Sequence, residues 1–248
     1  MHYNKGSKWE KGSEGMIGLI GAMPMEVDGL KERMERRETE TVAGIEFCRG
    51  ILSGVPCVAA RCNPGKVNAA LCTQIMITEY RPGLILNSGV AGGIGADVHI
   101  GDLVISSAVV QHDMDTSPLG DKKGYLSGIG LIRIPASPRL VETLAAAAKE
   151  VYSGTVHVGV IATGDQFICS AEKLHELQRE FGAVACEMEG GAVGHVCLAN
   201  GVEFAVLRAI SDNADDSADA DFSAFAPAAA QKGIRLICRV LPELAETS

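Results

Sequence analysis

Carboxylates follow two of the apolar segments that the sequence predicts as strands. Glu26 comes shortly after the segment 16–21, and Asp212 comes just after the segment 204–210. In open α/β sheets, ligands bind beyond the carboxyl ends of the strands. Carboxylic acids placed together at such an edge can act as general acid and general base. The sequence therefore predicts acid–base chemistry carried by side chains that lie far apart along the chain.

A positive charge also interrupts one of these apolar segments. Arg208 is the only charged residue between positions 204 and 210. A buried charge costs several kcal/mol unless it is paired, so a carboxylate partner is expected. Two interpretations stay open for Arg208, namely a purely structural salt bridge and a partner for a reacting carboxylate.

A third carboxylate stands at the start of a predicted helix over 187–200. Glu189 lies three, four, seven and eight residues before the apolar positions 192, 193, 196 and 197, so a helix would turn its carboxylate toward the core. Glu187 lies about 200° further round such a helix and is expected to point elsewhere. A contact between Glu189 and the helix dipole is the alternative interpretation.

Motifs for metals and cofactors are weak in this sequence. The segment 112–115 (His-Asp-Met-Asp) holds ligand-type residues, but a solvated loop is the simpler interpretation. The aspartates between 212 and 221 lack the spacing and the glycine of an EF-hand. The glycines at 89, 92, 93 and 95 do not match G-x-G-x-x-G. We therefore predict no metal and no cofactor, and we assign the chemistry to the carboxylates alone.

The elements that would position these residues alternate along the chain. Predicted strands cover 16–21, 45–52, 55–61, 83–87, 102–110, 156–162 and 204–210, and predicted helices cover 24–37, 66–79, 138–151, 171–180, 187–200 and 222–245. This alternation indicates an α/β fold, a three-layer α/β/α domain with a central mixed, largely parallel sheet. Residues 16–248 are expected to form one domain, and residues 1–15 a flexible leader outside it.

Composition narrows the class of protein further. The 248 residues carry a formal net charge of −9, which argues against a nucleic-acid or anionic-membrane partner. None of the eight cysteines forms a C-x-x-C pair, and most lie in apolar runs, as reduced core cysteines of a cytoplasmic protein do. With 47% hydrophobic and 21% charged residues, the composition is that of a globular domain.

Five motifs in order resemble the 5′-methylthioadenosine/S-adenosylhomocysteine nucleosidases of the nucleoside phosphorylase superfamily, over about residues 16–245. They are Ile17–Met23 with Glu26, Asn87–Gly93, Gly164–Ile168, Glu187–Glu189 and Arg208–Asp212. The resemblance implies a nucleoside phosphorylase/hydrolase-like fold and hydrolysis of the N-glycosidic bond of these two nucleosides, with release of adenine. It also implies a cytoplasmic homodimer that acts on a small nucleoside in methionine salvage, without a cofactor.

The resemblance implies roles for individual residues as well. Glu26 matches the carboxylate that activates the attacking water, and Asp212 matches the acid that protonates adenine on its imidazole-side ring nitrogen. Ser211 and Arg208 match neighbours that orient these two groups, and Arg208 beside Glu26 would then supply the ion pair that its burial demands. Glu189 matches the acceptor of the ribose hydroxyls.

The same resemblance implies the walls of a substrate pocket. Phe167 and Ile168 match the purine site, and Phe222 matches the residue that closes it. Leu119 matches an apolar position that the partner subunit inserts near the 5′ tail. The remaining implied pocket residues are Met188 against the sugar, Met23, Val90, Ala91 and Gly92.

Departures from the family pattern leave the exact substrate open. Val90 replaces a hydroxyl of many relatives, which removes one phosphate ligand and favours water as the nucleophile. Asn63-Pro64-Gly65 replaces Gly-Ile-Gly, and Pro24-Met25 replaces two acidic residues. The alternatives are a phosphate-dependent phosphorylase, a hydrolase of another nucleoside such as aminofutalosine, and a non-catalytic adenosine-binding protein.

Overall fold

The structure is a computed structural model that describes residues 15–246, so the prediction of a flexible leader falls almost entirely outside the described residues. The strands are β1 (Ile17–Gly21), β2 (Glu35–Val42), β3 (Ile45–Leu52), β4 (Val55–Arg61), β5 (Leu84–Gly93), β6 (Leu103–Gln111), β7 (Ile134–Pro135), β8 (Val156–Thr163), β9 (Ala183–Glu187) and β10 (Glu203–Asp212). The helices are α1 (Pro24–Arg33), α2 (Lys66–Tyr80), α3 (Pro138–Val151), α4 (Ala171–Phe181), α5 (Gly190–Asn200) and α6 (Ala218–Glu246), with a short 3₁₀ turn η1 (Ser117–Leu119).

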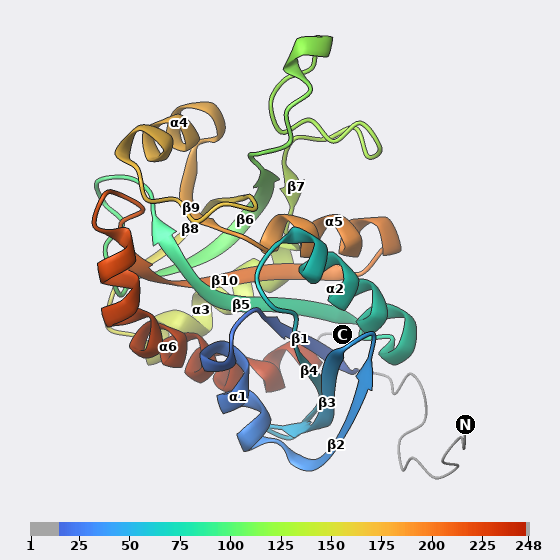
Figure 1. Cartoon of the computed structure of the whole chain (residues 1–248). Coiled ribbons are helices and arrows are strands. Elements are labelled where there is room, and N and C mark those ends of the chain that lie inside the picture. The colour runs from blue at the N-terminus through green and yellow to red at the C-terminus, as the bar shows by residue number, and fades with distance from the viewer. Residues whose placement is uncertain (1–14, 247–248) are drawn as a thin grey trace.

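All ten strands belong to one mixed sheet, and part of that sheet closes on itself. The strand order is β10-β6-β8-β9-β5-β1-β4-β3-β2, and β10 also pairs with β5. Strands β5, β10, β6, β8 and β9 therefore form a closed ring, from which β1, β4, β3 and β2 extend as an open wing (Figure 1). Among the described residues, five of the ten strand pairings are parallel and five antiparallel, so the sheet is mixed but not largely parallel.

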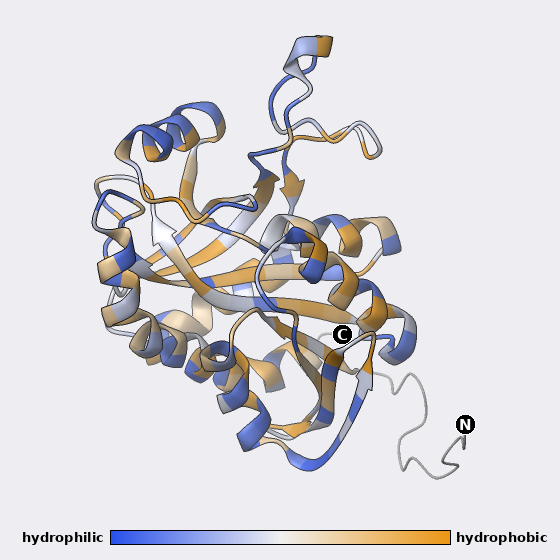
Figure 2. Cartoon of the chain, in the orientation of Figure 1, coloured by the Kyte–Doolittle hydropathy of each residue, from blue (hydrophilic) through white to orange (hydrophobic). Residues whose placement is uncertain are grey.

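Helices cover both sides of this sheet. Helices α1, α3 and α6 pack on one side, where their apolar residues share a core with β1, β4, β5 and β10 (Figure 1). Helices α2 and α5 pack on the other side against a second core. Figure 2 shows the apolar residues concentrated in the central strands and the polar residues on the outer helix faces. Within residues 15–246, none of the helices has the length and apolarity that a membrane span requires.

The α/β fold class and most of the predicted elements are confirmed, and three strands were missed, namely β2, β9 and the two-residue β7. The hairpin of β3 and β4 and the helix α3 have the predicted bounds. The helix predicted over 24–37 is wrong beyond Arg33, because β2 begins at Glu35. Strand β2 is a mostly exposed edge strand, rich in charged residues, so it lacks the apolar alternation that identifies a half-buried strand.

The missed strand β9 matters more for the site than β2 does. The sequence predicted a helix over 187–200, but Glu187 ends strand β9 and the helix α5 begins only at Gly190. The predicted opposition of Glu187 and Glu189 around one helix is therefore wrong. An extended segment followed by a turn lets both side chains face the same buried region.

Strand β5 crosses the centre of the molecule and depends on small residues. All ten of its residues are buried. A Cβ at Gly89 would lie 2.9 Å from Arg208 Nη1 and closer still to Glu26 Oε1. Glycine is therefore required there, because two charged side chains approach the backbone directly.

We predict that Gly89→Ala lowers the free energy of unfolding by about 1–3 kcal/mol, the usual cost of overpacking a closed site. Gly83→Ala, at the exposed position before β5 where an added Cβ meets nothing within 4 Å, is the matched control and should change it little. Urea unfolding measures both variants. Equal stability of the two would contradict the close approach at Gly89.

Candidate active site

A cavity of about 200 Å³ opens beyond the carboxyl ends of β1, β5, β9 and β10. It brings together most of the residues that the sequence predicted. Its lining residues are Ala22, Met23, Glu26, Pro64, Val90, Ala91, Gly92, Phe167, Cys186, Glu187, Met188, Glu189, Ser211, Asp212 and Phe222. Ile168 lines a smaller cavity of about 30 Å³ that shares Phe167, Met188 and Asp212 with the first.

Glu26 is fixed by the first turn of α1. Its Oε2 accepts hydrogen bonds from the backbone N–H groups of Ala22 (2.7 Å) and Met23 (2.8 Å), which is the return half of a capping box. Its Oε1 accepts a third from the N–H of Val90 on β5 (3.0 Å). Burial raises the pKa of Glu26, while Arg208 and these three N–H groups oppose the rise. The side chain is therefore a buried carboxyl held in one orientation by backbone donors.

Asp212 is placed by an irregularity at the end of β10. The register between β10 and β5 shifts between Ile210 and Asp212, and such bulges redirect side chains. Asp212 Oδ2 accepts a hydrogen bond from Ser211 Oγ (2.8 Å), and Oδ1 accepts one from the N–H of Ala214 (3.0 Å). Burial raises the pKa of Asp212; the two hydrogen bonds oppose this, and the charges of Asp221 and Asp215 add to the rise.

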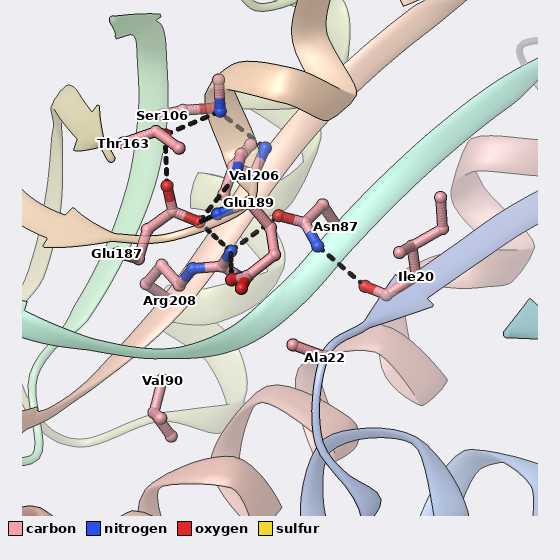
Figure 3. Close-up of polar contacts among 12 residues, drawn as sticks. Ile20, Ala22, Asn87, Val90, Ser106, Thr163, Glu187, Glu189, Val206 and Arg208 are labelled. Carbon is pink, nitrogen blue, oxygen red and sulfur yellow. Dashed lines mark hydrogen bonds and ion pairs between the residues drawn. The ribbon is translucent and has the colours of Figure 1, made fainter. Parts of the chain in front are cut away.

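The sequence predicted that Arg208 pairs with Glu26, but the structure gives Arg208 other partners. Its Nη2 donates to Glu187 Oε2 and to Asn87 Oδ1 (2.7 Å), and it lies 3.6 Å from Glu189 Oε2 (Figure 3). The arginine is 2% exposed, so it lies behind the cavity wall. The prediction of Glu26 as the partner is wrong, because β9 ends at Glu187 and this places the carboxylate of Glu187 closer to the guanidinium.

Glu189 is held between the guanidinium and the start of α2. Its Oε1 accepts a hydrogen bond from the N–H of Gly65 (2.9 Å). Burial raises the pKa of Glu189 to about 7, and the charge of Glu187 adds to the rise, while Arg208 and the Gly65 N–H oppose it. The carboxyl therefore titrates close to neutral pH, in a cavity that a polar ligand can enter.

Aromatic and apolar side chains form the rest of the cavity. Phe167 and Phe222 make an edge-to-face pair with their ring centroids 5.7 Å apart. Phe167 is 45% exposed, so the pair stands at the opening. Met188 and Cys186 line the wall beside Asp212. An apolar cavity with a few convergent carboxyls suits a flat, partly polar ligand.

The segment 112–126 behaves differently from the prediction at its two ends. His112 is buried against Gly164 and burial lowers its pKa, so the expectation of a solvated residue is wrong there. Asp113 binds Lys66 Nζ (2.6 Å), which ties the segment to α2. Leu119 does not line the cavity and is 84% exposed; it belongs to the excursion between β6 and β7 (residues 112–133), which projects from the body of the molecule (Figure 1).

Several residues of the site escaped the sequence analysis. Glu187 was assigned to a helix face that does not exist, although it follows an apolar run as the other site carboxylates do. Asn87 was quoted only as part of a motif, yet it bonds Arg208 and, through Nδ2, the carbonyl of Ile20 (3.0 Å). Thr163, the last residue of β8, donates to Glu187. A polar residue directly after a run of apolar residues in the sequence is the signal that could have identified all three.

Comparison with known proteins agrees with this geometry. The family model described as the phosphorylase superfamily matches residues 16–242. The chain is 39% identical, over 232 residues, to the 5′-methylthioadenosine/S-adenosylhomocysteine nucleosidase of Shewanella halifaxensis, covering 92% of this chain and 99% of that protein.

Solved structures give the same result. A nucleosidase of the same name from Neisseria meningitidis, in complex with methylthio-immucillin-A, superposes with a TM-score of 0.89 at 31% identity, over 92% of this chain and 99% of that one. The futalosine hydrolase of Helicobacter pylori strain 26695 superposes with a TM-score of 0.88 at 36% identity, over 92% and 97%.

The chain belongs to the phosphorylase superfamily, whose family model matches nearly the whole fold that forms the ring of strands and the cavity. Within it, the chain is similar to the 5′-methylthioadenosine/S-adenosylhomocysteine nucleosidases, so the resemblance drawn from the five motifs is confirmed.

We predict that Arg208→Gln lowers the free energy of unfolding by about 3–5 kcal/mol, because it leaves buried carboxylates without their cation. Arg239→Gln is the control: that arginine is paired with Glu150 and Glu243 at the surface, and its loss should cost about 1 kcal/mol or less. Urea unfolding at pH 7 measures both. Similar losses in the two variants would contradict the importance of the buried pair.

Proposed function

We propose that the protein hydrolyses the N-glycosidic bond of 5′-methylthioadenosine and S-adenosylhomocysteine and releases adenine. The observation that carries the proposal is the convergence of Glu26, Glu189 and Asp212 on one cavity. A protein that only binds adenosine has no need of three carboxyls there. The nucleosidase relatives, which match over nearly their whole length, support the same reaction.

Asp212 is the group we assign to the purine. Adenine leaves poorly as an anion, so protonation of the base lowers the barrier to bond cleavage. Burial raises the pKa of Asp212, which is the direction that a proton donor to the base requires. Ser211 and the N–H of Ala214 fix the orientation of that carboxyl. Phe167, Ile168 and Met188 would hold the flat base beside it.

Glu189 and Glu26 are the groups we assign to the sugar and the water. Glycosidic cleavage passes through an oxocarbenium-like state, so positive charge develops on the ribose. A carboxylate on the ribose hydroxyls, the role given to Glu189, binds that state more tightly than the ground state. Glu26 has both oxygens directed by backbone N–H groups and would accept the proton of the attacking water.

Water is favoured over phosphate as the nucleophile. Val90 offers only a methyl surface and its N–H, and that N–H is already bound to Glu26. Arg208 is committed to Glu187 and Asn87 behind the wall. A phosphate dianion would therefore meet carboxylates in the cavity rather than the cations that it needs.

Location and assembly are part of the proposal. All eight cysteines are free and six are buried, which fits a reducing cytoplasm, where methionine salvage would use this reaction. A homodimer would cover the exposed apolar residues Val67, Leu71 and Leu198 on α2 and α5. It would also bring the exposed Leu119 of one subunit toward the cavity of the other, near the 5′ tail of the nucleoside.

We predict that the protein releases adenine from both nucleosides without phosphate, and that Glu26→Gln and Asp212→Asn each lower kcat by at least about 10²-fold, the usual scale of acid–base contributions. Glu142→Gln, an exposed carboxylate of α3, is the control and should keep full activity. A coupled adenine assay with and without phosphate measures the rates. An absolute need for phosphate, or turnover only of aminofutalosine, would overturn the assignment.

We predict a dimer in light-scattering measurements, and a rise in KM for methylthioadenosine of at least about tenfold in Leu119→Ala, from loss of an apolar contact of about 1.5–3 kcal/mol. Leu131→Ala, in the same excursion and 37% exposed, is the matched control and should leave KM unchanged. A fully active monomer would contradict the partner's contribution.

A further inference from the structure

Glu187 lines the cavity, yet both of its oxygens are occupied by the protein. Oε1 accepts from Thr163 Oγ1 at the end of β8. Oε2 accepts from the N–H groups of Glu189 (3.1 Å) and Gly190 (2.7 Å), and from Arg208 Nη2. The side chain is 2% exposed. Four donors hold this buried carboxylate, three of them on Oε2, so Glu187 is fixed by the protein and acts through its neighbours.

The charges around Arg208 do not balance. Glu26, Glu187 and Glu189 act on the one guanidinium, which leaves an excess of two negative charges when all are ionised. Glu187 is in direct contact with Arg208, whereas Glu189 is 3.6 Å away and Glu26 forms no ion pair with it. Arg208 therefore stabilises the charge of Glu187 most directly and acts more weakly on Glu189 and Glu26. Figure 3 shows Glu187 and Glu189 beside the guanidinium.

We propose that Glu187 is a positioning residue that holds Arg208 against the end of β9, and that it thereby sets the charge and the orientation of the ribose-side carboxyl Glu189. This inference rests on the proposed function for its catalytic consequence. Its structural part, the competition of two carboxylates for one guanidinium, stands on the contacts alone.

The groups that face these two carboxyls come from four elements. Arg208 of β10 and Glu26 of α1 act on Glu189, whose own charge also acts on Cys62 after β4. Cys186 of β9 lies beside Glu187. The thiols are neutral, since burial raises the pKa of both. Glu187 and Arg208 are therefore the groups with the strongest charge effects on Glu189.

Removal of the charge at position 187 is expected to lower the pKa of Glu189. In Glu187→Gln the like charge beside Glu189 is lost and Arg208 is released to approach it. Both changes favour the ionised form of Glu189, so its pKa, about 7 in the intact protein, falls. A carboxylate drawn to Arg208 also turns from the cavity, which weakens its hold on the ribose hydroxyls.

The first experiment is the pH profile of kcat/KM for methylthioadenosine between pH 4.5 and 9, with the full-length chain. Glu187→Gln is expected to shift the acidic limb downward by about one pH unit or more and to raise KM more than it lowers kcat. Thr163→Val removes a donor to Glu187 but keeps the charge, so it is the matched control, with the limb unmoved. A Glu187→Gln profile of unchanged shape, merely lower in rate, would mean that Glu187 only supports the start of α5, and would overturn the proposal.

The second experiment needs no turnover. A folded-state pKa of about 7, against 4.5 for the free group, gives Glu189 a stabilising contribution that is present in full below pH 4.5 and lost as the pH rises through 7. The Tm of the unliganded protein should therefore fall less steeply between pH 5 and 8 in Glu187→Gln than in the wild type or in Thr163→Val. An equal slope in all three would overturn the charge coupling.

The two experiments separate the proposal from the function on which it rests. A wild type that releases no adenine would refute the proposed function, while the Tm slopes would still test the coupling. If Glu187→Gln does not fold, Glu187→Asp replaces it: its carboxylate is one methylene shorter and lies further from Arg208, so the same shifts should appear with smaller size. Wild-type behaviour of that variant would overturn the proposal.

Discussion

A single buried guanidinium organises the centre of this molecule. Arg208 lies in the middle of β10, 2% exposed, and its Nη2 reaches the end of β9 through Glu187 and the middle of β5 through Asn87. A buried cation is stable only with partners of fixed geometry. The contacts that satisfy Arg208 therefore also hold three strands of the closed ring in the register that forms the cavity.

Backbone geometry completes what the ion pair begins. Glu26 is directed by the first turn of α1, and Asp212 by the bulge at the end of β10 and the N–H of Ala214. The helix turn and the bulge each span only a few residues. Each fixes the position of one carboxyl, because backbone N–H groups cannot rotate away. The site thus combines one long-range constraint with two short-range ones, and glycine at position 89 leaves space for Arg208 and Glu26.

The sequence pattern was sufficient for the fold class and for the carboxyls Glu26 and Asp212, because apolar strands followed by polar residues are a local signal. The apolar and aromatic residues of the cavity were implied only by the family resemblance. The sequence pattern failed where the decisive fact was not local. Strand β2 carries charges on an exposed edge, and β9 is five residues long and runs directly into the turn before α5. The placement of Glu187 at a strand end reversed its expected direction, and with it the partner of Arg208. The closure of the ring through β10 and β5 has no signature in the order of elements.

Burial raises the pKa of all three carboxyls, yet the charges and hydrogen-bond donors around them differ, and these differences match the roles that we propose. Burial and the charges of Asp221 and Asp215 raise the pKa of Asp212, which suits a group that donates a proton. Glu26 has three backbone donors and Arg208 to stabilise its charge, which suits a base. Glu189 has one backbone donor, and the guanidinium beside it is in closer contact with Glu187. The proposed acid, base and ribose ligand are therefore distinguished less by residue type than by the charges and backbone donors around each carboxyl.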